Sequence, residues 1–144
     1  MKKIQLLLPL LLFVSIKSYS QCDGLEMGTF ISIDSIAGTT TIQRLGNVQL
    51  EVNEKLGVKA IQKLNWISQC NYSITNMRML SNKGVIGNPT GNFHVKVEQI
   101  NDSVFNQTVT IESHDFVHTS IIKKVSDEVS EGFKELLKEH YPNR

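Results

Sequence analysis

The feature that most constrains the fold is a series of short segments in which apolar and polar residues alternate, each followed by a turn signal. In residues 48–52 (VQLEV), valine or leucine alternates with glutamine and glutamate. A period of two is typical of a β-strand, whose successive side chains point to opposite faces. Turn signals such as Gly46-Asn47 separate the segments. The pattern predicts eight strands, at residues 27–33, 39–45, 48–52, 58–66, 70–80, 93–100, 104–113 and 116–124.

The short connections between these segments predict an antiparallel meander, which forms a small lipocalin-like barrel or a sandwich. The main ambiguity is at residues 54–67, where alanine, leucine and lysine also suit a helix. Alternating lysines and β-branched residues favour a strand there. Residues 81–92 contain three glycines, a proline and three asparagines, and are predicted to form a long loop.

The hydrophobic period changes near the C-terminus and predicts one helix at about residues 126–140. Ser126 is the predicted N-cap, and Asp127 and Glu128 would lie in the first turn, where the helix dipole favours acidic groups. Apolar residues recur at helical spacing, at Val125, Val129, Phe133, Leu136 and Leu137. This apolar stripe is expected to pack on the sheet.

Residues 1–20 have the pattern of a secretory signal peptide. Lys2 and Lys3 precede an apolar segment at residues 6–16, which is too short to span a bilayer. Ser18 and Ser20 provide the small residues of a cleavage site, so we expect cleavage after Ser20. The mature chain would be a single β-rich domain, 21–144, with no transmembrane segment, in the periplasm or secreted.

Lipid attachment at Cys22 is the alternative reading of this segment. It is disfavoured because the long polar side chain of Gln21 precedes the cysteine. The charge balance also depends on cleavage. The chain has 15 basic and 14 acidic residues, and removal of three lysines with residues 1–20 leaves 12 basic residues and a net charge of −2. That balance argues against a nucleic-acid partner, which requires a basic surface.

Two cysteines, Cys22 and Cys70, remain after cleavage. In an oxidising compartment an even number of cysteines favours a disulfide, and only one intramolecular pairing exists. Two free thiols are the alternative, but no C-x-x-C motif supports a redox role.

The four histidines, His94, His114, His118 and His140, do not predict a metal site or a catalyst. His114 and His118 have H-x-x-x-H spacing, but on a strand residues four apart lie about 13 Å from each other. Ser113-His114-Asp115 has the composition of a hydrolase triad, but adjacent residues do not converge as a triad does. We therefore predict no catalytic residue, metal or cofactor; a hydrolase that uses His114 or His118 is the least supported class.

Aromatic residues from several predicted strands are the candidates for a ligand cavity. Trp66, Tyr72 and Phe93 are the predicted ligand-binding residues. The alternative is an ordinary aromatic core without a cavity. Barrels of about eight strands are just wide enough to hold one small ligand, so both arrangements fit this fold.

A spaced pattern runs through residues 22–74: C, then G-x-F at 28–30, I-x-R at 42–44, Q-x-E at 49–51 and W-x-x-x-C-x-Y at 66–72. This pattern resembles a family of short exported bacterial proteins of unknown function. The resemblance implies a lipocalin-like barrel with the two cysteines bridged. The C-terminal helix and the 81–92 loop depart from the family outline.

These observations favour a non-enzymatic exported β-barrel that binds a small apolar ligand at the cell envelope. The alternative is a protein–protein interaction module of the envelope, which would use an exposed edge strand or the 81–92 loop.

Overall fold

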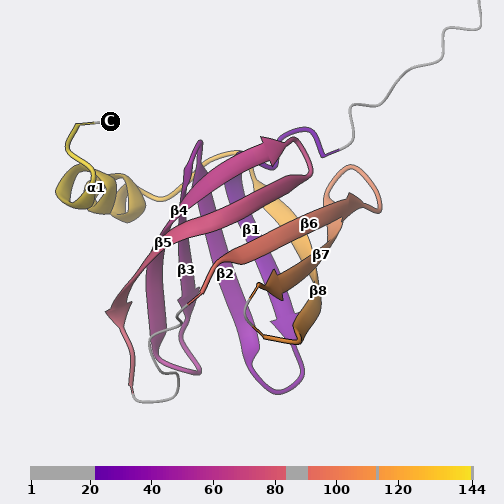
Figure 1. The fold of residues 1–144 in the computed structure, drawn as a ribbon. Helices are drawn as coiled ribbons and strands as arrows, with labels where there is room; N and C mark the ends of the chain where they lie inside the picture. The colour runs from indigo at the N-terminus through magenta and orange to yellow at the C-terminus, as the bar shows by residue number, and fades with distance from the viewer. Residues whose placement is uncertain (1–21, 84–90, 113, 144) are drawn as a thin grey trace, which may run out of the picture.

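A closed barrel of eight antiparallel strands forms the body of the computed structural model, which describes residues 22–83, 91–112 and 114–143 (Figure 1). Each strand pairs with the next one along the chain, and β1 also pairs with β8. The elements are β1 (Met27–Asp34), β2 (Gly38–Leu45), β3 (Val48–Asn53), β4 (Val58–Ser68), β5 (Asn71–Ser81), β6 (Phe93–Gln99), β7 (Val104–Ile111), β8 (Phe116–Ser126) and α1 (Glu131–His140).

The predicted fold class is confirmed, and the structure decides for a barrel over a sandwich. All eight predicted strands are present, with small differences at their ends, and β4 occupies the segment for which a helix was the alternative. The predicted signal peptide and most of the 81–92 loop lie outside the described residues.

Closure of the barrel depends on the pairing of the first and last strands. Ile31 of β1 lies opposite Lys123 of β8, and Ser32 lies opposite Ile122. Each strand of the described barrel therefore has a neighbour on both sides. Closure removes the free backbone groups of sheet edges, so the edge strand invoked for an interaction module is not available.

Residues 22–26, which we call the N-terminal plug, lie against one end of the barrel. Leu25 and Cys22 are buried in the same cluster as the inward-facing side chains. Cys22 forms a disulfide with Cys70, which lies in the turn between β4 and β5. The backbone N–H of Cys22 also donates to the side-chain oxygen of Gln99, at 2.8 Å. The disulfide and this hydrogen bond hold the plug in place.

Helix α1 packs on the outside of the barrel, against β3 and β4 (Figure 1). Phe133 and Leu137 are buried there against Val48, Leu50 and Ile61. The outward side chains that the helix covers, Val48 and Leu50 of β3 and Ile61 of β4, are therefore apolar. This packing also explains why Ile61 interrupts the alternation along β4.

The predicted start of the helix at Ser126 is wrong. Ser126 is the last residue of β8, and Ser130 is the N-cap, with its side chain accepting from the N–H of Phe133 at 3.2 Å. Val125, predicted in the helical stripe, lies in β8 and is exposed. Pairing with β1 extends β8 as far as Ser126, which lies opposite Thr29. The helix therefore starts after this residue.

Loss of the disulfide is expected to destabilise the barrel. The bridge joins residues 48 positions apart, and a loop of that length corresponds to about 4 kcal/mol of unfolded-state entropy. We expect the Cys22→Ser/Cys70→Ser variant to lose about 3–4 kcal/mol of the free energy of unfolding in urea. The control is the oxidised wild type without reductant, and equal denaturation midpoints for the two proteins would contradict the expectation.

Candidate functional site

A fully buried arginine lies inside the barrel, between the N-terminal plug and the rest of the interior. Arg44 of β2 has 0% exposed surface. Its Nε donates to Oε1 of Gln49 at 2.6 Å, and its Nη1 donates to the carbonyl of Leu25 in the plug at 3.4 Å. Its Nη2 donates to the hydroxyl of Tyr72 at 2.6 Å and to Oε1 of Gln107 at 3.3 Å. These acceptors come from the plug and from β3, β5 and β7.

Aromatic rings also contact the guanidinium. Its central carbon lies 5.0 Å from the ring centroid of Phe30 and 5.0 Å from that of Tyr72. A buried charge is costly unless its hydrogen-bonding groups are satisfied, and cation–π contacts contribute further when water is excluded. Among the described residues, every buried side-chain nitrogen and oxygen has a hydrogen-bond partner. The buried polar side chains of the interior therefore have hydrogen-bond partners within the protein itself.

Gln49 connects the arginine to a carboxylate. While its oxygen accepts from Arg44, its Nε2 donates to Oε1 of Glu51 at 2.7 Å and to Oε1 of Gln62 at 2.9 Å. Burial raises the pKa of Glu51 above its ordinary value of 4.5, and the charge of Arg44 opposes part of that rise. Arg44 and Glu51 are thus coupled electrostatically and through hydrogen bonds, with Gln49 between them.

A cavity of about 240 Å³ lies inside the barrel on the side of these polar groups away from the plug. We call this cavity the chamber. Ser32 and Thr40, near the β1–β2 turn, place its mouth toward the end of the barrel opposite the plug. Its lining includes Ser32, Thr40, Ile42, Gln49, Glu51, Gln62, Tyr72, Ile74, Met77, Phe93, Val95, Gln107, Val109, His118 and Ser120.

The structure places two of the three predicted ligand-binding residues in the chamber. Tyr72 and Phe93 both line it. Trp66 does not; its ring packs against Tyr72, with centroids 4.7 Å apart, and its indole N–H donates to the carbonyl of Gly46 at 3.0 Å. Trp66 therefore supports the ring of Tyr72 from outside the chamber.

The polar residues of the site were missed by the sequence analysis. Arg44, Gln49 and Glu51 belong to the I-x-R and Q-x-E segments. The alternation in these strands does not show which of their two faces points into the barrel. The available signal was an apolar stripe on the C-terminal helix, which needs an apolar surface to cover. If the apolar side of residues 48–52 is the surface that the helix covers, then Gln49 and Glu51, on the opposite side, face the interior of the barrel.

The histidines are dispersed over the molecule. On the surface, Nε2 of His94 lies 2.8 Å from Oε1 of Glu112. Nδ1 of His140 lies 3.2 Å from Nη1 of Arg78. His118 lines the chamber. Ser113, part of the triad-like tripeptide, lies outside the described residues.

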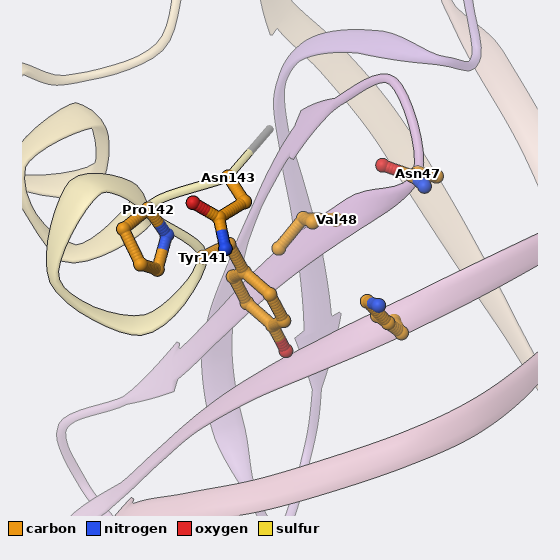
Figure 2. A pocket seen from close by; sticks show the side chains of 6 residues that line it. Asn47, Val48, Tyr141, Pro142 and Asn143 are labelled. Carbon is orange, nitrogen blue, oxygen red and sulfur yellow. The ribbon is translucent and has the colours of Figure 1, made fainter.

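A second hollow, of about 340 Å³, lies on the outside of the barrel where the chain passes beyond α1 (Figure 2). Figure 2 shows Tyr141 next to Val48, with Pro142 and Asn143 on the helix side and Asn47 on the other side of the hollow. Lys63 completes its lining, with Nζ 5.4 Å from the Tyr141 ring centroid, and burial raises the pKa of Tyr141. This hollow is a seam between the C-terminal residues and the barrel wall, whereas the chamber is lined by residues of all eight strands.

No group of three or more His, Cys, Asp or Glu side chains suited to a metal ion occurs among the described residues. Nor does that part of the chain contain a helix with the length and apolarity needed to cross a membrane. Comparisons with protein-family models, with curated proteins and with solved structures find no match to this chain. Function therefore has to be inferred from the chemistry of the site.

Replacement of Arg44 by methionine is expected to destabilise the barrel strongly. Arg44→Met would remove the donor to Gln49 and Tyr72, leave Gln107 with only the hydroxyl of Tyr72 as donor, and remove the positive charge that favours ionised Glu51. Breaking a buried charge network in this way costs about 3–5 kcal/mol, measured by urea denaturation. The matched control is Arg78→Met, at an exposed position of β5, with an expected change within about 0.5 kcal/mol. Equal losses for the two variants would contradict the role assigned to Arg44.

The raised pKa of Glu51 predicts a pH-dependent stability difference between wild type and Glu51→Gln. Below 4.5, Glu51 is protonated in both the folded and the unfolded state. As pH rises above that value the unfolded state ionises first, so the stability of wild type falls relative to the variant. The fall ends once pH has passed the raised pKa of the folded state. Urea denaturation from about pH 4 to pH 8 measures this difference, and a constant difference would refute it.

Proposed function

We propose that this protein is an exported, non-enzymatic β-barrel that binds one small molecule in the chamber at the cell envelope. The observation that carries this proposal is the cavity of about 240 Å³ inside the barrel, lined by residues of all eight strands. Small-molecule sites are typically preformed concavities with mostly apolar walls and a few polar groups that fix orientation. The chamber has this composition, with apolar residues from four strands, among them Ile42, Ile74, Phe93 and Val109, and a polar wall at Gln49, Glu51 and Gln62.

The volume of the chamber limits the size of its ligand. A dry cavity of about 150 Å³ holds benzene. By the same proportion, the chamber suits a ligand of about ten non-hydrogen atoms. This size is below that of most drug-like molecules, whose pockets begin at about 300 Å³. A small aromatic or short aliphatic molecule is therefore the best fit.

Two observations support the exported location. Residues 1–20 have the pattern of a signal peptide. The disulfide between Cys22 and Cys70 is typical of proteins that mature in an oxidising compartment. The plug that this disulfide holds lies against the end of the barrel away from the chamber mouth. The bridge thus closes one end and leaves the other end as the route of entry.

An interaction module of the cell envelope is the second candidate function. It is favoured by outward-facing apolar side chains on the paired strands β1 and β8, where Ile33 is 74% and Ile121 49% exposed. Crosslinking in intact envelopes distinguishes the two functions. A crosslink to one dominant partner that disappears in the Ile33→Ser/Ile121→Ser variant would favour the interaction module. The variant Ser120→Phe, which blocks the chamber, should leave such a crosslink unchanged.

Blocking the chamber tests the proposed function. Ser120 of β8 points into the chamber, while its neighbour Thr119 is exposed on the outside of the barrel. The probe is indole, whose binding is followed by changes in the backbone amide NMR spectrum. We expect wild type and Thr119→Phe to bind indole with a dissociation constant of about 1 mM or tighter. Ser120→Phe should lose binding because its ring fills the cavity.

Val109→Phe provides a second blocking variant, and circular dichroism establishes that each variant is folded. Unchanged indole affinity in both folded blocking variants would contradict the assignment of the binding site to the chamber.

A further inference from the structure

The charge of the chamber lining is set by a single carboxylate. Among the residues that line the chamber, Glu51 is the one acidic side chain, and His118 is the one basic side chain. Glu51 is partly exposed, whereas its partners Gln49 and Gln62 are each only 1% exposed. All three side chains line the chamber, so a molecule in the chamber lies beside the carboxyl group of Glu51 as well as the two amides.

Arg44 does not present its charge to the chamber. Its guanidinium is absent from the lining and is fully buried. The side chains of Gln49, Tyr72 and Gln107, which accept its hydrogen bonds, all line the chamber and so stand between the two. Because Coulomb interactions weaken with distance, a ligand experiences the carboxylate more strongly than the guanidinium behind it. When Glu51 is ionised, the chamber wall is therefore electronegative at this residue.

The other lining groups suit an ammonium ion with an apolar body. An ammonium has three N–H donors. One can bond the Glu51 carboxylate, and hydroxyl oxygens of Thr40 and Ser120 lie in the same lining. The body of the ligand would pack against Phe93 and the aliphatic wall, where an adjacent cation gains from the aromatic face. A ligand carboxylate would instead meet the like charge of Glu51.

We propose that the ligand of the chamber is a small primary amine with an apolar aromatic or aliphatic body, held by an ion pair between its ammonium group and Glu51. This inference rests on the proposed function, since it names the chemical class that the chamber selects. Glu51 has two roles in this arrangement: it compensates the buried Arg44 when the chamber is empty, and it pairs with the ligand when the chamber is occupied.

Three probes of similar size and different charge test the inference. They are 2-phenylethylamine, its neutral counterpart 2-phenylethanol, and the anion phenylacetate. Binding is measured by amide NMR titration at about pH 8, where a primary amine is still largely protonated and an ordinary histidine is neutral. Wild type should bind the amine at least about tenfold more tightly than the alcohol, and phenylacetate most weakly.

The decisive variant is Glu51→Gln, which keeps an acceptor for Gln49 but removes the charge. We expect it to bind the amine and the alcohol with equal affinity. The matched control is Glu98→Gln, on the exposed face of β6, which should keep the wild-type preference for the amine.

The outcomes separate this inference from the proposed function. Equal binding of amine and alcohol to wild type would refute the amine inference and leave the ligand-binding function intact. Tightest binding of phenylacetate would also refute it and would assign the selectivity to Arg44. If neither indole nor any of the three probes binds to wild type, the proposed function itself fails.

Discussion

The buried guanidinium of Arg44 is the constraint on which the interior of the barrel depends. A charged side chain with five N–H donors is tolerated out of water only if acceptors surround it. Here the acceptors are Gln49, Tyr72, Gln107 and the carbonyl of Leu25, so one side chain of β2 ties together the plug and three other strands. A shift of β2 by one residue would turn Arg44 outward and remove its hydrogen bonds to these acceptors. The arginine therefore specifies the register of the barrel as well as its polarity.

The same network gives the barrel its two different ends. On the side of Leu25, the plug and its disulfide fill the space with apolar contacts. On the other side, the partners of Arg44 form a polar wall, and beyond them the side chains of Ile42, Ile74 and Val109 leave a cavity. Because the polar groups already satisfy one another, the cavity has a fixed chemical lining before any ligand enters. Such preorganisation reduces the entropic cost of binding a small molecule.

Much of the fold could be predicted because its signals are local. Alternation and turn residues fix strand positions without reference to the rest of the chain, as at Gly46-Asn47 between β2 and β3. The helix was predicted to start at Ser126 because that residue satisfies the local rules for an N-cap as well as Ser130 does. What decides between them is the pairing of β8 with β1, a contact between residues about a hundred positions apart. Local preference is a weak term compared with a strand pairing that closes the barrel.

The sequence by itself determined the number and order of the strands, the presence of a terminal helix and the single possible pairing of Cys22 with Cys70. Only the tertiary structure decided which side of each strand faces inward. For β3, the helix covers Val48 and Leu50 on the outside, and this turns Gln49 and Glu51 toward the interior. An alternating strand is compatible with either orientation, because its period of two gives both faces equal regularity. Helix α1 buries one face of β3 and so decides which face points inward. That orientation places Gln49 and Glu51 in the lining of the chamber.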